Sequence, residues 1–484
     1  MSTYRLPGVT VNILDNPRII NIGGDVRIPA IVGLGPVTRA VTDEAVIRAT
    51  GSIDYLSVYP ANGVAVSQYA NTPGVIAGGL NYQSIFLNGA LYNAAVATAS
   101  VIGSIRWPQG GATADWPSTG SVYYVTYTYA PPMTQLDPYT TQDKEELKAR
   151  YGAQDTNTGI LTTAGLIALE NGAPAVMLVQ ASGSSYSETT YKAAIDKLQK
   201  KTNIEQLVVV FPASVTRTQQ ETLLTYAYSH VIQMSNLSRE RGLMSGSPSG
   251  YYTATGFDVI GDAATNPSYV YRATALKNRN STYVVPSRIQ RKNDLGVTME
   301  LDGNFAAAGV AGVQAAQTLQ CTPIHGYPVV GITIEDEKWN EFEMDQLGAG
   351  NCLVLESRAG VVTIRDAITT DPTSADTQEI SVVSVQRLVK RTLRETLKNT
   401  YTNKGKVINS NTTSAVEATT NAVLSSLVTA GEIYEFGESD NPTTGEVKIS
   451  AQQNRQEPRQ IDVTCSYKPL YPLKFIAISV SVYV

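Results

Sequence analysis

Ala175-Val176-Met177-Leu178-Val179 and Leu207-Val208-Val209-Val210-Phe211 are continuous apolar runs, and the segment 187–201 between them has apolar residues at helical spacing. Fully apolar runs of this length are typical of strands buried on both faces of a parallel sheet. A strand, a helix and a second strand in this order form the repeating unit of α/β folds. Further helices are predicted over 158–171 and 218–237. We therefore expect a central α/β domain over 135–315.

A second α/β region is predicted from residue 316 onward. Short apolar strands are expected at 329–334, 352–355 and 361–365, followed by two long helices. The first helix, over 378–401, has an apolar stripe formed by Val382, Val385, Val389, Leu393 and Leu397. The second helix covers 414–430, with Val416, Val423, Leu424 and Leu427 directed inward. Closing strands are expected over 459–467 and 474–484.

The helix over 378–401 also has basic residues at helical spacing. Arg387, Lys390, Arg391, Arg394 and Lys398 are spaced so that they share one face. The chain as a whole has a net negative charge, whereas this helix face is positively charged. It is either an ordinary solvated helix face, with Glu395 among the cations, or an electrostatic dock for an acidic protein partner.

Both ends of the sequence alternate like strands with one buried face. Near the start, Val9, Val11 and Ile13 alternate with polar residues, and near the end the same pattern is formed by Ile476, Ile478, Val480 and Val482. These strands either join a sheet of their own chain or add to the sheet of a neighbouring molecule. Strand addition between copies would make the protein a polymer subunit.

The segment 26–134 reads as a separate β-rich domain with many turns. Its clearest strand is the aromatic and β-branched run 122–129, which is bounded by turn residues on both sides. A shorter apolar strand is expected over 26–33. We expect this domain to be inserted between the N-terminal segment and the central α/β domain.

Composition narrows the classes of function. The chain has 484 residues, of which 16% are charged, and a net charge of −5. It therefore offers no broad cationic surface for nucleic acid or anionic membranes, and neither direct nucleic acid binding nor membrane insertion is expected. The first residues do not resemble a secretory signal, which favours assembly in a cytoplasm. The three cysteines, Cys321, Cys352 and Cys465, are expected to be reduced core thiols.

Catalytic and metal-binding patterns are not completed anywhere in the sequence. There are two histidines, and nothing near Cys321 and His325 completes a metal shell. Gly246-Ser247-Pro248-Ser249-Gly250 has proline where a nucleophile elbow needs its nucleophile. The Gly33-Leu34-Gly35 turn lacks a third glycine. The acidic residues at 335–345 are interpreted as a solvated or partner-facing surface. No catalytic residue, metal or cofactor is therefore expected.

Several of these segments resemble the tail sheath proteins of contractile phage tails and related contractile injection systems. The opening Tyr4-Arg5-Leu6-Pro7-Gly8-Val9 is similar to the start of that family. So are Glu170-Asn171-Gly172-Ala173 before an apolar strand and the helix end from His230 to Gly242. The strand 359–367 followed by Ile380-Ser381-Val382-Val383-Ser384-Val385-Gln386-Arg387-Leu388 is similar as well, and so is the closing strand after Pro472.

The resemblance implies an architecture and a function. It implies an inner α/β domain built from both chain ends, 1–25 and 316–484, with strand-exchanging arms, an α/β middle domain over 135–315 and a β-rich outer domain over 26–134. It implies subunits that form hexameric rings in a helical sheath around an inner tail tube, with a baseplate and a tail terminator as further partners. Contraction would drive the tube through a target envelope. The basic face from Arg387 to Lys398 would then contact the tube.

Two other classes of function stay open from the residues alone. A β-rich phage adhesin or another tail structural protein would also be rich in tyrosine, of which this chain has 27, and would lack catalytic residues. An α/β hydrolase is compatible with the central domain, although the sequence offers no credible nucleophile or base.

Overall fold

The computed structural model divides into two compact units. It describes residues 28–35, 137–183, 185–248, 268–334, 339–402, 407–436 and 449–472, together with the strands between 36 and 136 given below. The larger unit contains the residues described up to 35 and from 137 onward, except 150–152, which cluster with the smaller unit.

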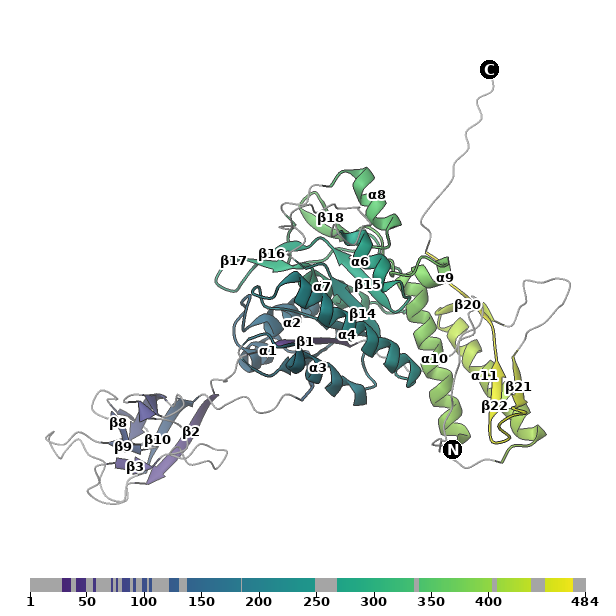
Figure 1. The fold of residues 1–484 in the computed structure, drawn as a ribbon. Helices are drawn as coiled ribbons and strands as arrows, with labels where there is room; N and C mark the ends of the chain where they lie inside the picture. Colours follow the sequence, from purple (N-terminus) through teal and green to yellow (C-terminus); the bar gives the residue numbers. More distant parts are fainter. Residues whose placement is uncertain are drawn as a thin grey trace. The chain divides into compact units, whose positions relative to one another are not determined.

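An eight-stranded sheet forms the centre of the larger unit (Figure 1). Its order is β11 (Tyr139–Thr141), β12 (Val176–Ala181), β1 (Pro29–Leu34), β13 (Gln206–Val209), β14 (Gly242–Gly246), β15 (Ser281–Val285), β18 (Leu353–Arg358) and β19 (Val361–Ile364). The six inner strands are parallel, and the two edge strands are antiparallel to their neighbours. The inner strands are apolar runs because both faces of the sheet are covered.

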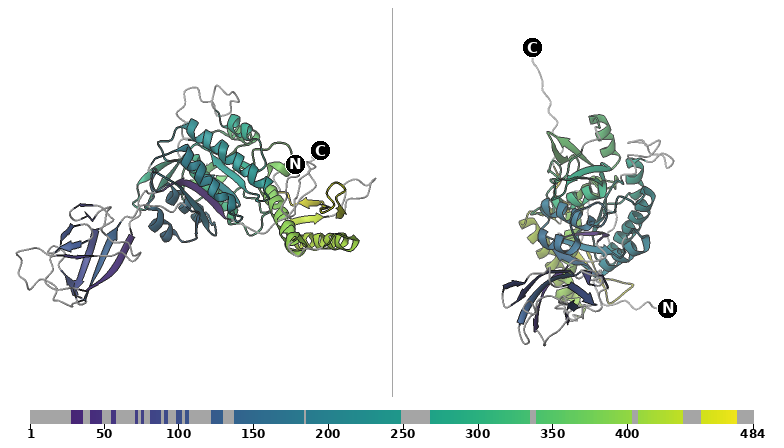
Figure 2. Two further views of the ribbon diagram at one scale, coloured as in Figure 1. Left: turned by 60° about the horizontal axis from the view of Figure 1, so that its bottom comes forward. Right: turned by 90° about the vertical axis from the view of Figure 1, so that its left-hand side faces the viewer.

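Helices cover both faces of this sheet (Figure 2). The first helices are α1 (Lys144–Tyr151), α2 (Ile160–Glu170), α3 (Glu188–Asp196), which continues into the 3₁₀ turn Lys197–Lys200, and α4 (Arg217–Asn236). Helix α2 packs on β1 and β12, whereas α3 and α4 pack on each other. In the sheet, β12 and β13 lie on opposite sides of β1. Helix α2 belongs to the connection from β1 to β12, and α3 to the connection that returns from β12 to β13. The two connections run in opposite directions, which places α2 and α3 on opposite faces of the sheet. A change of crossover direction beside β1 also marks the place where α/β sheets usually open a pocket.

Helix α7 (Gly303–Ala315) is buried along its whole length between the sheet and α2. It is rich in alanine and glycine, and a Cβ atom at Gly312 would lie 2.4 Å from the carbonyl oxygen of Ala168 on α2. The close approach of the two helices therefore requires glycine at this position. A helix without a polar face has no amphipathic pattern, which is why the sequence did not predict it.

The remaining elements of the larger unit complete two regions. Helix α6 (Tyr269–Leu276), the hairpin of β16 (Arg288–Lys292) and β17 (Thr298–Asp302), and α8 (Glu341–Ala349) lie around the sheet. The C-terminal part consists of α9 (Ala375–Gln378), α10 (Ile380–Thr400), α11 (Ser410–Thr429), β20 (Ile433–Phe436), β21 (Ser450–Gln453), β22 (Ile461–Thr464) and β23 (Tyr467–Pro469). Helix α10 lies between the sheet and α11 (Figure 1).

The C-terminal part has its own hydrophobic core. Val385, Val389 and Leu393 of α10 pack in one cluster with residues of α11, β20 and β23, including Leu424 and Tyr467. All the apolar positions predicted for the two long helices are buried in the structure. The predicted faces of both helices are therefore confirmed.

The smaller unit is made of short antiparallel strands. Its four-stranded sheet has the order β2 (Val41–Arg48), β10 (Val122–Tyr129), β6 (Asn81–Leu87) and β7 (Ala90–Tyr92). A three-stranded sheet joins β3 (Tyr55–Ser57), β9 (Ser104–Arg106) and β8 (Thr98–Val101), and β4 (Asn71–Thr72) pairs with β5 (Val75–Ile76). The tyrosine-rich strand predicted over 122–129 has the predicted bounds.

The structure confirms the mixed α/β class and corrects several details. The strand expected over 26–33 does not belong to the β-rich unit: β1 lies inside the main sheet, where both faces are covered. No boundary separates 315 from 316 in the sheet, because β18 continues it beside β15. The segment 329–334 makes only an isolated bridge at Thr333, and the strand expected over 459–467 is divided into β22 and β23.

Candidate functional site

Cys321 and His325 lie four positions apart in the sequence, and no metal site was predicted for them. Among the described residues, no cluster of three or more His, Cys, Asp or Glu side chains is placed to hold a metal ion. The Cys321 thiol donates to the carbonyl oxygen of Gly431 at 3.2 Å, and all three cysteines are free and buried. No helix among the described residues is long and apolar enough to cross a membrane.

His230 of α4 is a buried structural residue. Its Nε2 atom lies 3.4 Å from Nη1 of Arg241, which itself donates to the carbonyl oxygens of Leu198 and Lys201. Burial, followed by the charge of Arg241, lowers the pKa of His230 to about 4. The imidazole is therefore neutral near pH 7, and the arginine joins α4 to the chain that follows α3.

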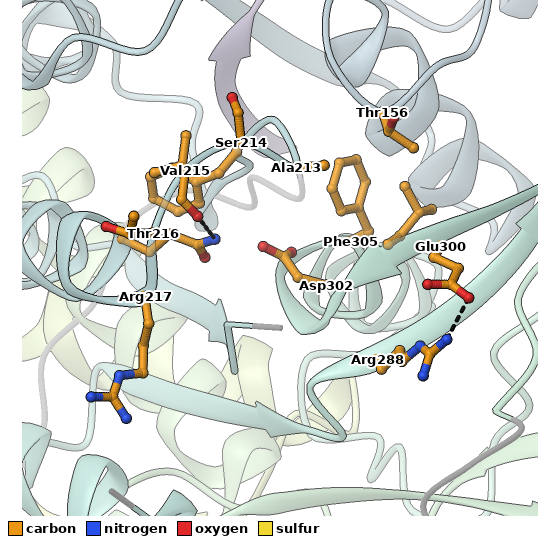
Figure 3. A pocket seen from close by; sticks show the side chains of 13 residues that line it. Thr156, Ala213, Ser214, Val215, Thr216, Arg217, Arg288, Glu300, Asp302 and Phe305 are labelled. Carbon is orange, nitrogen blue, oxygen red and sulfur yellow. Dashed lines mark hydrogen bonds and ion pairs between the residues drawn. The ribbon is translucent and has the colours of Figure 1, made fainter. Parts of the chain in front are cut away.

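A pocket of about 550 Å³ opens at the carboxyl edge of the main sheet, beyond the end of β13 (Figure 3). The carboxyl group of Asp302 and the ring of Phe305 both project into it (Figure 3). Thr156 comes from the loop between α1 and α2. The rest of the lining comes from the loop after β13, the start of α4 and the β16–β17 hairpin: Phe211, Ala213, Ser214, Val215, Thr216, Arg217, Gln220, Arg288, Glu300 and Leu301.

Asp302 is the N-cap of α7. Its side chain accepts a hydrogen bond from the backbone N–H of Asn304 at 3.0 Å, and the Asn304 side chain in turn donates to Gln220 Oε1 at 3.1 Å. Burial raises the pKa of Asp302 to about 7, although hydrogen bonds from Asn304 and Gln220 favour its charged form. Among the described residues, no ion pair is formed by this carboxyl, and Arg288 at the rim pairs with Glu300.

The pocket does not form a catalytic set. Its lining contains hydroxyl groups but no histidine, cysteine or lysine. The Thr216 hydroxyl is engaged in capping α4, where it accepts from the Gln219 backbone. The Asp302 carboxyl, whose pKa is raised, could act as a base, but its hydrogen bond is made to the Asn304 backbone as the cap of α7 and not to a hydroxyl of the lining. We therefore assign this pocket no reaction.

The basic face predicted on α10 does not face solvent. Arg387, Lys390, Arg391 and Arg394 are 4–8% exposed and are paired within the chain, whereas Lys398 is exposed. The interpretation as a solvated helix face is therefore wrong for four of the five residues, and these four do not form an exposed dock in this conformation. The reason is that α10 lies between two cores, so its cationic face turns toward the main sheet while its apolar stripe packs in the C-terminal core.

Two glutamates receive the cations of α10, and we call these six residues the α10 seat. Arg391 Nη2 lies 2.5 Å from a carboxylate oxygen of Glu205, and Arg387 Nε lies 3.3 Å from the other. Arg394 donates from both Nη atoms to Glu240, at 2.8 and 2.6 Å. Lys390 Nζ lies 3.8 Å from Glu240. Charge-assisted and bidentate bonds of this kind are the strong ones in proteins.

The two glutamates are positioned by the fold of the sheet. Glu205 directly precedes β13 and Glu240 lies just before β14, the neighbouring parallel strand. Parallel strands begin at the same edge of a sheet, so both carboxylates reach the amino edge together. A chain of neutral hydrogen bonds extends the seat, from Gln206 to Gln314 at 2.8 Å and from Gln314 to Ser384 of α10 at 2.7 Å.

Burial and pairing act in opposite directions in the seat. Burial disfavours the Glu240 carboxylate, but hydrogen bonds and charge from Arg394 and Lys390 hold the pKa of Glu240 below its usual range. Burial lowers the pKa of Lys390 to about 8, although the charge of Glu240 opposes this shift. A buried charge persists only when partners compensate for its desolvation.

Sequence reasoning missed the acidic half of the seat. The available signal was an acidic residue directly ahead of each of two apolar strands, at Glu205 and Glu240. Nothing in the spacing of the sequence links these positions to α10, which lies more than a hundred residues further along. The predicted arm residues Val9, Val11, Ile13, Ile476, Ile478, Val480 and Val482 lie outside the described residues.

The C-terminal part of the chain matches a known family. Residues 373–483, which contain α9, α10 and α11, match the phage tail sheath C-terminal domain. The chain is similar to tail sheath proteins. It is 22% identical over 371 residues to the tail sheath protein of Mycobacterium phage Bxz1; the alignment covers 75% of this chain and 59% of that protein's length.

Solved sheath structures share the fold. The helical sheath of the anti-feeding prophage in its contracted state is similar over 99% of both chains, with a TM-score of 0.54 and 10% identity. The contracted sheath complex of the extracellular contractile injection system PVC is similar over 100% of this chain and 99% of that chain, with a TM-score of 0.51 and 11% identity. The resemblance predicted from the sequence is therefore confirmed. The α10 seat joins the part of the chain that matches the family model to the α/β body.

Proposed function

We propose that this protein is the structural subunit of a contractile tail sheath. The subunits polymerise as a helical sheath around an inner tail tube. Contraction of the sheath drives the inner tail tube through the envelope of a target cell. The match of residues 373–483 to the sheath C-terminal domain carries this proposal. The full-length similarity to helical sheath subunits supports it. The subunit then belongs to the virion and is assembled in the host cytoplasm.

The partners follow from this role. The subunit binds copies of itself in hexameric rings, the inner tail tube, a baseplate and a tail terminator. The fold is also similar, with a TM-score of 0.51, to a chain of the anti-feeding prophage baseplate. The subunit does work through assembly and not as an enzyme. Direct contact with nucleic acid and insertion into a membrane are not part of the proposal.

The small sheets of the C-terminal domain are suited to receive strands from neighbours. Within the described residues, β20 pairs only with β23, and β21 pairs only with β22. Two-stranded sheets are marginal alone and leave backbone groups open at their edges. We infer that the arms containing Val9–Ile13 and Ile476–Val482 add strands to such sheets in neighbouring subunits.

The α10 seat connects the C-terminal part of the subunit to the α/β body in this proposal. Arg387, Arg391 and Arg394 pair with Glu205 and Glu240 and hold the helix, and Lys390 is buried beside them in this conformation. Of the residues predicted to contact the tube, Lys398 remains exposed and keeps that role. Movement of the C-terminal domain is then transmitted through α10 to the α/β body.

Contraction needs no bond-making chemistry. A sheath can store free energy as the difference between two packings of the same subunits. Each subunit needs to contribute only a few kcal/mol, because a helical polymer adds many equivalent contacts. The β-rich unit from 36 to 136 is assigned the outer position in the sheath.

Electron microscopy of the purified protein tests the proposal. The full-length chain should form long hollow tubes. Deletion of residues 1–14 or 473–484 should abolish tubes but leave soluble subunits with unchanged circular dichroism. Tubes formed by both deletion variants would rule out strand exchange, and the absence of tubes from full-length protein mixed with its tail tube would contradict the sheath function.

A further inference from the structure

The α10 seat contains more positive than negative charge. Arg387, Lys390, Arg391 and Arg394 face two carboxylates, Glu205 and Glu240. All six residues are at most 8% exposed. Water therefore screens the imbalance little, and an unpaired charge in such a site opposes the docking of the helix that carries it.

The arginines alone supply an ion-pair partner to both carboxylates. Glu205 receives Arg391 at 2.5 Å and has Arg387 at 3.3 Å, and Glu240 receives a two-pronged pair from Arg394. The seat would thus remain paired without any contribution from Lys390.

Lys390 is the least well paired cation of the seat. Its ammonium lies 3.8 Å from Glu240, beyond hydrogen-bonding distance. Two further cations act against it, Arg394 on its own helix and Arg279 in the loop before β15. The charged groups facing it are therefore one carboxylate that is already engaged and two guanidinium groups.

We propose that Lys390 is a surplus buried cation that weakens the docking of α10, so that the sheath C-terminal domain is held on the α/β body by a releasable joint. The arginine pairs fix where the helix docks, and the ammonium limits how tightly it docks. Loss of the Lys390 proton strengthens the joint. A two-state sheath subunit can use such a joint, but the property belongs to the single chain and does not depend on polymer formation.

The pH dependence has a defined sign. Burial of Lys390 lowers its pKa from 10.5 to about 8, so the docked helix disfavours the proton. The docked state therefore gains stability as the pH rises from about 8 toward 10.5, and it loses that contribution as the pH falls through about 8. Near neutral pH the ammonium is charged and the joint is at its weakest.

Hydrogen exchange of α10 measured by mass spectrometry tests this inference. The full-length chain is compared with Lys390→Met at pH 7, under conditions where light scattering shows unassembled subunits. Removal of the surplus charge should slow hydrogen exchange of the α10 amides on the order of tenfold or more. The reason is that a pKa of Lys390 lowered by one pH unit on docking corresponds to about a tenfold weaker docking equilibrium for the charged side chain. In the unmodified chain, the protection of α10 relative to that of α2 should rise between pH 8 and pH 10.

Lys398→Met is the matched control, because this lysine lies on the same helix but is exposed. It should leave exchange of α10 unchanged at both pH values. Faster exchange in Lys390→Met would show that the ammonium stabilises the seat and would overturn the inference. The inference would also be overturned if, in the unmodified chain, the ratio of amide protection in α10 to that in α2 did not change with pH. This second measurement needs no variant. Tube formation is scored separately, so this result and the sheath function can fail independently.

Discussion

Buried carboxyl groups at the two edges of the main sheet behave in opposite ways. Glu205 and Glu240 lie at the amino edge and Asp302 at the carboxyl edge, and all are at most 7% exposed. Arginine cations lie within 3 Å of both glutamates, whereas the hydrogen bonds that Asp302 receives from the described part of the chain come from neutral groups. The pKa of Glu240 is lowered, and that of Asp302 is raised to about 7.

This difference shows that burial alone does not fix the charge of a carboxyl group. Desolvation acts on both groups in the same direction, toward the neutral acid. A bidentate arginine reverses its effect at Glu240, and the hydrogen bonds that Asp302 receives as a helix cap do not. The ion pairs of Glu240 therefore stabilise the amino edge of the sheet in its charged form, whereas the fold favours the neutral form of Asp302 at the carboxyl edge.

The largest expected effect comes from breaking the amino edge. Glu240→Gln removes the charge that compensates Arg394 and Lys390 but keeps the shape of the side chain. Because two buried cations lose their partner, we expect the free energy of unfolding to fall by about 3–5 kcal/mol. Urea denaturation followed by circular dichroism measures this loss.

The control for that variant is Glu395→Gln on the exposed side of α10, which should change stability by less than about 0.5 kcal/mol. If both variants unfold at the same urea concentration as the unmodified chain, the pair of Glu240 with Arg394 does not hold α10. The Glu240 contribution should also disappear in acid, because a lowered pKa gives stability that is present above about pH 4.5 and is lost as the pH falls through the pKa of the folded state.

A smaller effect with the opposite sign is expected at Asp302. The folded chain holds the Asp302 proton more tightly than the unfolded chain, because the pKa is raised from 3.8 to about 7. This contribution to stability is complete below about pH 4 and is lost as the pH rises through about 7. Asp302→Asn keeps the helix cap without the charge, so it should raise the melting temperature at pH 8.

The matched variant Asp302→Ala separates the cap from the charge. It removes the hydrogen bond to the Asn304 backbone and should cost about 1 kcal/mol relative to Asp302→Asn. Thermal melts of the three proteins at pH 5 and pH 8 give the comparison. An Asp302→Asn protein that melts lower than the unmodified chain at pH 8 would mean that Asp302 is stabilised as an anion.

Features that depend on neighbouring residues could be predicted from the sequence, whereas features that depend on contacts distant in sequence could not. The strands at β12 and β13 and the apolar faces of α10 and α11 follow from local periodicity, and the structure confirms them. The family resemblance followed from local motifs for the same reason. Helix α7 was missed because it is apolar on all sides, and its neighbour α2 reaches it only through contacts distant in sequence.

The basic face of α10 was recognised from its spacing, but its environment was not. Whether Arg387 to Arg394 meet water or carboxylates depends on the placement of Glu205 and Glu240, which lie 182 and 154 positions from Arg387 and Arg394. Helical spacing predicts which residues share one face of a helix, but it does not predict which groups that face contacts. For the same reason, the raised pKa of Asp302 could not be predicted, since it depends on burial beneath the loop after β13.

The smallest expected effect lies at the rim of the pocket, where Arg288 pairs with Glu300. Their side chains are 26% and 59% exposed, so water competes for both charges and the pair should contribute less than about 1 kcal/mol. A double-mutant cycle with Arg288→Gln and Glu300→Gln measures this coupling, and the same cycle with Arg394→Met and Glu240→Gln measures the buried pair. The buried coupling should be several times larger, because desolvation leaves each partner with no alternative. Equal couplings would mean that water reaches the α10 seat, and the opposite behaviour of the two sheet edges would then need another cause.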